Sequence, residues 1–415
     1  MEIKKDIQIK KFCFYGFFKN LKFFEPYLFI YFIRNGLSFL EIGILFSLKE
    51  IIIYTFEIPS GIIADYYGKK NELKMCFIMY IFSFLLFFIG HNFFILTIAM
   101  ILFGLGEAFR SGTHKAMIYE YLEQNNIFHL KSRVYGYTRS YSKIGSAISS
   151  FLAIAIALNL KHYHTIFLFS ILPYLIDFIL VNSYDESLNG RVETEISLKK
   201  FIMLMKTQLK SIVSNKKLNN IVINSSVYAS VYSVIKDYIQ PIIVAFLLLT
   251  ITDTVYDIDQ LTKIILGVLY GTFSIGSVIV SRYSYKANKY ISSKKIMDFT
   301  FIALGGILIL ISFSIKYNSI VVLLIIYFII FVSEDFRKPH FIAITGDYMK
   351  KEERATVMSY NSQMKSTLMI VMSPLVGFVA DKFSINMMFL ILGILILFIV
   401  FTVFVFRNNK GEDNG

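Results

Sequence analysis

The chain contains few charged residues, few prolines and almost no cysteine. Charged residues make up 17% of its 415 residues, whereas soluble domains usually carry about 25%. Hydrophobic residues make up 56% and the mean hydropathy is +0.60, so much of the apolar surface must face something other than water. Six prolines and 42 phenylalanines fit long helices that face lipid. The composition therefore predicts an all-α membrane protein.

Signatures of enzymes and cofactor sites are also missing. Cys13 and Cys76 lie in apolar stretches without metal-ligand spacing, which favours two small buried side chains. Residues 57–70, EIPSGIIADYYGKK, place an acid between two glycines, but a phosphate-binding loop needs G-x4-G-K-[ST]. Six residues separate Gly61 from Gly68, and a second lysine stands where that loop needs Ser or Thr. No HExxH or paired Cys/His pattern occurs, so we expect no enzyme, no cofactor and no metal site.

Twelve stretches are long enough to cross a membrane, which takes roughly 20 mostly apolar residues. They are centred near residues 23, 51, 82, 106, 146, 173, 235, 273, 306, 332, 367 and 396. Of the lysines and arginines in the connecting segments, 26 lie on the side that holds both termini and five on the other. Because positive loops stay in the cytoplasm, we expect a multi-pass cell-membrane protein with both termini cytoplasmic.

The excess of lysine and arginine in the segments on the side that holds both termini accounts for the net charge of +13. We therefore expect no nucleic-acid partner. The N-terminal MEIKKDIQIKK lacks a small-residue cleavage site, and the apolar run behind it continues into a full span. We therefore expect no cleaved signal peptide.

The two halves of the sequence resemble each other. EAFR at residues 107–110 recurs as EDFR at residues 334–337, and Glu25–Pro26 is echoed by Gln240–Pro241. Many secondary transporters are built from such a duplicated helical unit. The repeat therefore predicts twelve transmembrane helices in two pseudo-symmetric six-helix bundles.

A polar stretch separates these two sets of spans. We expect an N-terminal bundle at residues 1–185, a cytoplasmic linker at 186–218 and a C-terminal bundle at 219–415. Within the linker, SLKKFIMLMKTQLKSIV places apolar residues opposite lysines at helical spacing. This pattern predicts an amphipathic helix that lies along the inner membrane surface.

The glycine–aspartate stretch falls in the loop between the second and third spans. As GIIADYYGKK it resembles the G-x-[L]-x-D-[RK]-x-G-[RK]-[RK] signature of the major facilitator superfamily, although Ile63 replaces leucine and Tyr66 a basic residue. With the spans, the linker and the repeat, the resemblance covers nearly the whole chain. It implies a transporter in which this loop latches the two halves together on the cytoplasmic side. The plainer alternative is a capped turn whose lysines only set the orientation of the protein in the membrane. The motif residues are Gly61, Asp65, Gly68, Lys69 and Lys70.

Ionisable residues inside the spans indicate function, because a charge at membrane depth costs roughly 2.5–3.5 kcal/mol or more unless it is paired or lines a watery cavity. The strongest candidates lie near mid-membrane, and Asp177 in the sixth span stands alone. The acid–arginine pairs of the two repeats have a plainer alternative, in which ion pairs only hold a bundle together. The candidate substrate and proton pathway consists of Lys22, Glu25, Glu50, Glu107, Arg110, Arg139, Lys143, Asp237, Glu334, Arg337 and Lys365.

Two departures from the family limit the functional interpretation. Met100 occupies the place of an arginine that many relatives carry in the fourth span, and the fifth span lacks the G-x-x-x-G-P signature of drug antiporters. Bases outnumber acids within the spans, and Lys143 and Lys365 lie at similar depths in equivalent helices. The sequence therefore predicts a secondary transporter of a small polar or anionic organic solute that works by alternating access.

Several partners and alternatives accompany this prediction. Protons are a candidate coupling ion with Glu25 as their carrier, and the expected partners are a small-molecule substrate and the lipid bilayer, with the protein as a monomer. The alternatives are an efflux carrier for drugs or lipophilic cations and a membrane receptor with a transporter fold.

Overall fold

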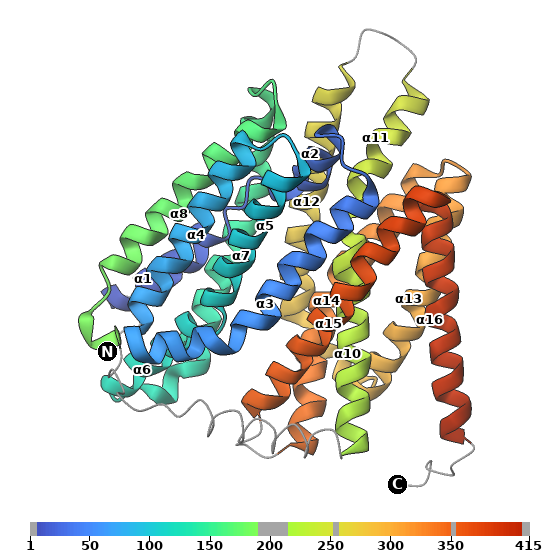
Figure 1. The fold of residues 1–415 in the computed structure, drawn as a ribbon. Helices are drawn as coiled ribbons and strands as arrows, with labels where there is room; N and C mark the ends of the chain where they lie inside the picture. Colours follow the sequence, from blue (N-terminus) through green and yellow to red (C-terminus); the bar gives the residue numbers. More distant parts are fainter. Residues whose placement is uncertain (1–5, 190–214, 252–256, 350–353, 409–415) are drawn as a thin grey trace. The chain divides into compact units, whose positions relative to one another are not determined.

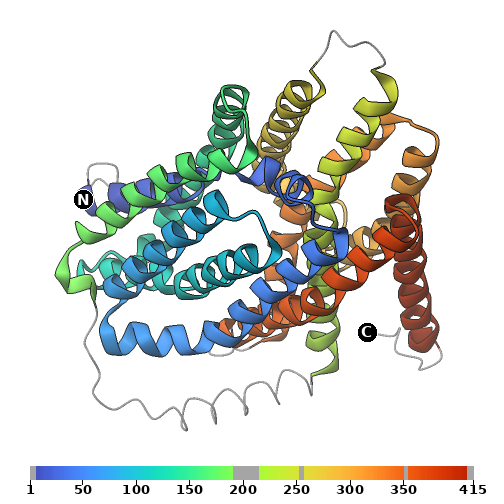
Figure 2. The same ribbon diagram turned by 45° about the horizontal axis from the view of Figure 1, so that its top comes forward.

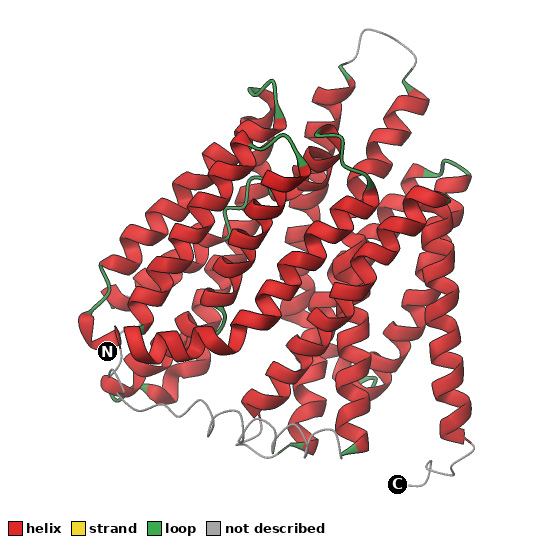
Figure 3. Cartoon of the chain, viewed as in Figure 1, coloured by secondary structure: helices red, strands yellow, loops and turns green. Residues whose placement is uncertain are grey.

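The computed structural model describes residues 6–189, 215–251, 257–349 and 354–408. All regular secondary structure in these ranges is helical (Figure 3). The amphipathic helix predicted in the linker lies outside the described residues. The chain divides into two compact units, the first made of residues 1–37, 44–202 and 251–275 and the second of residues 38–43, 203–250 and 276–415.

The first unit contains most helices of the first sequence half together with the beginning of α12. Within it α4 packs against α5 and α8, and α1 packs against α7 and α8 (Figures 1 and 2). Its elements are α1 (Ile7–Lys19), η1 (Glu25–Tyr27), α2 (Leu28–Arg34), α3 (Phe39–Tyr67), α4 (Lys69–Ile89), α5 (Phe93–Arg110), α6 (Thr113–Gln124), η2 (Phe128–Leu130), α7 (Lys131–Leu158), η3 (Tyr163–Thr165), α8 (Ile166–Asn182) and η4 (Glu186–Asn189).

The second unit contains the helices of the second half together with the first residues of α3. Here α13 packs against α14 and α16, and α10 packs against α15, so the helix pairs of the first unit recur in the second. This recurrence confirms the pseudo-symmetry predicted from the repeat. The elements are α10 (Lys216–Ile235), η5 (Lys236–Tyr238), α11 (Ile239–Thr250), α12 (Ile258–Tyr283), η6 (Ser284–Lys289), α13 (Ser293–Lys316), α14 (Ile320–Tyr348), α15 (Arg354–Lys382) and α16 (Ile385–Asn408).

Nine helical segments of the described chain are long and apolar enough to cross a membrane. Helices α3 and α14 are also long enough but carry more charged residues, and the segment from α1 to α2 is interrupted between Lys19 and Glu25. With α1–α2, α5–α6 and α10–α11 each counted as one crossing, the element order gives the expected twelve. The all-α membrane fold is confirmed.

Short polar side chains define where several of these helices begin. Asp6, Asn92 and Asn215 each precede a helix, and each side-chain oxygen accepts a backbone N–H three residues later, at 2.9, 2.9 and 3.2 Å. Such N-caps satisfy N–H groups that have no partner within the helix. They place the start of α1, α5 and α10 at fixed points of the sequence.

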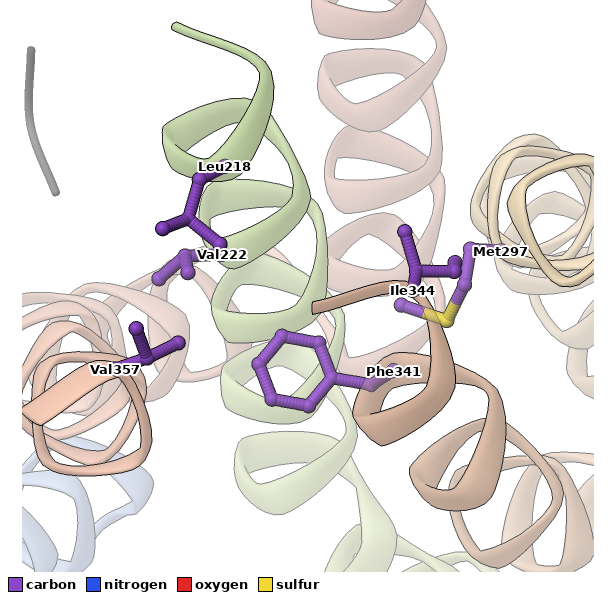
Figure 4. Close-up of a cluster of buried hydrophobic side chains, with 6 residues drawn as sticks. All are labelled: Leu218, Val222, Met297, Phe341, Ile344 and Val357. Carbon is purple, nitrogen blue, oxygen red and sulfur yellow. The ribbon is translucent and has the colours of Figure 1, made fainter. Parts of the chain in front are cut away.

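Each unit has its own apolar core. In the first, Tyr80, Phe84 and Tyr174 are buried, with ring centroids 4.9 to 5.0 Å apart between Tyr174 and the other two. In the second, side chains from α10, α13, α14 and the start of α15 form one cluster (Figure 4). Its buried members are Leu218, Val222, Met297, Phe341, Ile344 and Val357. These cores fix the helices that carry the candidate residues.

Candidate functional site

The first membrane-crossing segment is interrupted halfway. Helix α1 ends at Lys19, η1 begins at Glu25 with Pro26 behind it, and α2 completes the crossing. Lys22 lies in the interruption, and Glu25 opens the 3-10 turn. Non-helical backbone at membrane depth is tolerated only where protein buries it or a watery cavity borders it. The interruption therefore leaves Lys22 and Glu25 in or beside irregular backbone, and their part in solute binding stays a prediction.

The seventh crossing carries a milder irregularity at the corresponding place, a single 3-10 turn within a helix that otherwise continues. Helix α10 ends at Ile235, a 3-10 turn holds Lys236 and Asp237, and α11 with Pro241 completes the crossing. The Lys236 Nζ lies 3.7 Å from the Asp237 carboxylate. Discontinuous helices in corresponding positions of two repeats are a strong indication of a binding site. Sequence reasoning noted the two proline pairs but did not predict the breaks.

Glu107 and Arg110 of α5 form the polar centre of the first unit. Arg110 Nη2 donates to the Glu107 carboxylate at 2.5 Å, and Arg110 Nε lies 3.3 Å from the Tyr80 hydroxyl. Lys19 and Lys22 also act electrostatically on the Glu107 carboxylate. Arg110 is therefore the ion-pair partner of Glu107, and among the described residues neither lysine forms an ion pair with this carboxylate.

The matching arginine of the second unit has different partners. Arg337 of α14 is 3% exposed and donates to the Met297 carbonyl at 2.8 Å and to the Asn224 side-chain oxygen at 2.6 Å. Its guanidinium also lies 3.9 Å from the centroid of the Tyr228 ring. In the described structure no ion pair joins it to Glu334, so the pairing considered from the sequence is wrong for this residue. Arg337 instead ties α10, α13 and α14 together.

The acids beside Arg337 pair with the next lysine along the same helix. Lys338 Nζ lies 3.1 Å from the Asp335 carboxylate and 3.7 Å from that of Glu334. In α3 the Glu50 carboxylate is 3.0 Å from Lys49 Nζ. These pairs lower the net charge that Glu334 and Glu50 contribute to any pathway.

The remaining candidates lie on equivalent helices. Arg139 and Lys143 belong to α7, and Lys365 belongs to α15. Arg139 is exposed, whereas the two lysines are partly buried. The Lys365 carbonyl accepts the Ser230 hydroxyl of α10 at 3.1 Å, which brings α15 close to α10. The role of Arg139, Lys143 and Lys365 in transport stays a prediction.

The motif loop makes several ion pairs within the first unit. Gly68 has φ +91°, a conformation that favours glycine, and the Asn189 side chain fills the space where a Cβ would point. Lys69 Nζ lies 2.6 Å from the Glu120 carboxylate, and Lys70 pairs with Glu186. The lysines thus have fixed structural partners in addition to any topogenic role.

The two other motif residues lie in the last turns of α3. A Cβ built at Gly61 would meet nothing within 4 Å among the described atoms, so the close helix packing expected there is not seen. The side chain of Asp65 lies outside the described residues. Its predicted latch role stays a prediction.

A cluster of hydrogen bonds and ion pairs that was not predicted from the sequence lies at the start of α12. In the first unit the Asp259 carboxylate of α12 accepts the Tyr163 hydroxyl at 2.8 Å and pairs with Lys263 at 2.7 Å and Arg34 at 3.5 Å. The Tyr27 hydroxyl donates to the Lys263 carbonyl at 2.9 Å. The beginning of α12 is therefore bound to residues of the first sequence half.

A reciprocal contact lies in the second unit. The Asp381 carboxylate of α15 accepts the backbone N–H groups of Phe39 and Leu40 at 3.0 and 2.7 Å. Gly43 and Gly377 let the backbones of α3 and α15 approach each other, since a Cβ at either would overlap the opposite backbone. The acidic residues Asp257 and Asp259 at the start of α12 are the sequence signal that could have indicated the first of these two contacts.

Comparison with known proteins identifies the family. The profile described as "Major Facilitator Superfamily" matches residues 12–366 and 260–414. The chain is 22% identical over 395 residues to "Uncharacterized MFS-type transporter YxaM" of Bacillus subtilis (strain 168), covering 94% of this chain and 93% of the relative.

Solved structures show the same fold. A mutant of the nucleoside transporter NupG superposes with a TM-score of 0.79 at 13% identity, covering 96% of this chain and 99% of the other. A POT family transporter in complex with a thioalcohol-conjugated peptide gives 0.66 at 12% identity, covering 97% and 96%. The protein is thus a multi-pass membrane transporter for a small-molecule substrate, and the chain belongs to the Major Facilitator Superfamily.

Proposed function

We propose that this protein is a secondary transporter that moves a small polar, anionic organic solute across the cytoplasmic membrane by alternating access. The observation that carries the proposal is the interruption of the first crossing beside Lys22 and Glu25, at a place where the seventh crossing has a 3-10 turn with Lys236 and Asp237. Half-helix ends and unwound backbone offer polar groups for solute and ion binding at membrane depth.

The charges of the first unit favour an anion over a cation. Arg110 neutralises Glu107 through their ion pair, while Lys22 lies close enough to act on the same carboxylate. The Lys22 amine forms no hydrogen bond or ion pair with the described residues, so its charge is available to a ligand. A low-dielectric interior focuses such a charge and raises the local concentration of an oppositely charged solute.

The rest of the pathway follows from the sequence. We place Lys143 and Lys365 along the solute route because of their depth in equivalent helices, and the proton is the proposed coupling ion, for which Glu25 was the carrier expected from the sequence. We also propose that both termini lie in the cytoplasm and that the protein is a monomer. The two helical bundles are proposed to comprise residues 1–185 and 219–415. The motif loop with Asp65 is proposed to favour one of the two alternating states.

Uptake into proteoliposomes tests the transport function. The purified protein is assayed with a panel of labelled probes comprising organic anions, neutral nucleosides, short peptides and lipophilic cations, with and without a pH gradient. The proposal predicts saturable uptake of an organic anion. Movement of lipophilic cations alone would overturn the anion assignment and favour the efflux alternative, and a protein that binds probes without moving any would indicate a receptor.

A further inference from the structure

Asp177 of α8 is a buried carboxyl group without hydrogen-bond partners. It is 0% exposed, and neither carboxylate oxygen has a hydrogen-bond donor in the described structure. It lies five residues before the end of α8 at Asn182, about 7 Å along the helix axis. Burying a carboxylate without donors is costly, and Asp177 has no part in the solute route described above. Such a group is suited to gaining and losing a proton.

The surroundings of Asp177 contain one charged side chain and three hydroxyls. The charge that acts on it is Lys19 of α1. The hydroxyls in electrostatic range belong to Tyr15 of α1, Tyr174 of α8 and Tyr184, which follows α8. The Tyr15 hydroxyl is also buried without a hydrogen-bond partner. The cluster therefore combines an unpaired acid and an unpaired hydroxyl.

Titratable groups of α4, α5 and α6 lie around the same tyrosines. They act on the Tyr15 or Tyr174 hydroxyls, and the His114 ring stacks on the Tyr15 ring with centroids 3.6 Å apart. These groups are Cys76 and Tyr80 of α4, Glu107 and Arg110 of α5, and His114 of α6. Lys19 is therefore the counter-ion of a deprotonated Asp177.

Polar contacts lead from this cluster to the surface. The His114 Nε2 lies 3.1 Å from the Tyr184 hydroxyl, and Lys70 Nζ donates to the Tyr184 carbonyl at 3.0 Å. Lys70 also pairs with Glu186, whose side chain is 78% exposed. The first turns of α1 also lie at this end, since Lys11 Nζ donates to the Ser183 carbonyl at 2.5 Å. A proton at Asp177 thus has polar groups between it and water on the proposed cytoplasmic side.

Lys19 joins the cluster to the proposed solute route. It acts electrostatically on Asp177 and also on Glu107, which Lys22 faces as well. When Asp177 is deprotonated, its carboxylate attracts the Lys19 ammonium group. When Asp177 is protonated, the Lys19 ammonium group instead attracts an anion near Lys22. Proton binding and anion binding then favour each other, and this coupling is reciprocal.

We propose that Asp177 is the proton-binding residue of this carrier and that Lys19 couples its protonation to binding of the anionic solute. Each cycle then moves one proton on Asp177 together with one anion. The proposal rests on the proposed transport of an anion and replaces Glu25 as the proton carrier. It predicts that anion affinity rises as pH falls.

Infrared spectroscopy tests the proton site without any substrate. The C=O absorption of protonated carboxyl groups is titrated with pH in the purified wild type, in Asp177→Asn and in the control Asp185→Asn, which alters an exposed acid eight residues away. The proposal predicts a band that titrates with pH and is lost only in Asp177→Asn. A wild type without such a band, or with a band that Asp177→Asn retains, would overturn it.

Transport by the same variants tests the coupling. With one proton per anion, a pH gradient of one unit supports an accumulation ratio of about tenfold. Asp177→Asn, which resembles the protonated state, should lose this tenfold accumulation and its pH dependence but still exchange labelled for unlabelled anion. Proton-driven accumulation by Asp177→Asn at the wild-type level would refute the coupling.

Two further experiments distinguish failure of the coupling from failure of folding or of transport. If Asp177→Asn does not fold, Lys19→Gln carries the coupling test, because it keeps the acid but removes its counter-ion, and it should also lose proton-driven accumulation. Accumulation by Lys19→Gln at the wild-type level would refute the coupling. If the wild type moves no probe, the proposed function fails, and the infrared titration still decides whether Asp177 binds a proton.

Discussion

Replacing Asp381 by Asn should shift the balance between the two states of the proposed alternating-access cycle. Asp381 accepts two backbone N–H groups at the start of α3, and these contacts tie a helix of the first sequence half to α15 of the second. A carrier that opens at this end must separate them. The contacts therefore stabilise only the state in which this end is closed.

The size of the shift follows from the two hydrogen bonds. A net hydrogen bond contributes about 0.5–1.5 kcal/mol, and a negative charge at an exposed helix N-terminus adds about 0.3–1 kcal/mol. Asn keeps one acceptor oxygen but loses the other and the charge. The expected loss is about 1.4 kcal/mol, which changes the equilibrium about tenfold.

Labelling of one introduced cysteine measures this shift. Ser373 of α15 is 4% exposed, and its carbonyl lies against Gly43 of α3, so Ser373→Cys reports separation of the two helices. The native cysteines are buried and give little background. Reaction with a membrane-impermeant maleimide should be about tenfold faster when Asp381→Asn is added. An unchanged rate, equal to that of the neighbouring control Lys382→Gln, would refute the reasoning.

Two further substitutions test the structural roles assigned above. Gly68→Ala should lower stability by about 1–2 kcal/mol, because alanine is strained at positive φ. Gly61→Ala should not lower stability, because its side chain would meet nothing within 4 Å among the described atoms and alanine is favoured over glycine inside a helix. Thermal unfolding of both variants checks this, and equal midpoints would contradict it. Arg337→Lys should cost about 2–4 kcal/mol, because lysine cannot replace the fork that binds two helices at once. The exposed Arg139→Lys serves as the control for the same unfolding measurement, and equal losses would show that Arg337 has no special role.

Hydropathy and repeat spacing were sufficient to predict the twelve crossings and the two bundles. They were sufficient because lipid imposes long apolar helices, and because duplicated sequences such as EAFR and EDFR fold into equivalent helices. The breaks in the first and seventh crossings were not predicted. Pro26 and Pro241 mark both places, but whether a proline interrupts a helix depends on neighbouring groups that replace the lost hydrogen bonds.

The partners of each ionisable residue were the hardest part to predict. Arg110 and Arg337 occupy the same position of the same repeat, yet one pairs along its own helix and the other binds Asn224 and the Met297 carbonyl. The difference comes from which side chains neighbouring helices present. Spacing along one helix contains no information on those neighbours. The isolation of Asp177, by contrast, was predicted from its span alone.

Uptake by Lys22→Gln tests the central claim most directly, because Lys22 lies in the interrupted first crossing and is the residue that we propose to bind the anion. The control is Lys10→Gln, which removes an exposed lysine from α1. Proteoliposomes containing either variant or the wild type are compared for uptake of the anion identified in the probe panel. The account predicts that Lys22→Gln loses at least about tenfold in kcat/KM, equal to about 1.4 kcal/mol of lost binding in the transition state, while Lys10→Gln matches the wild type. Wild-type uptake by Lys22→Gln would contradict the placement of the solute at the interrupted helix.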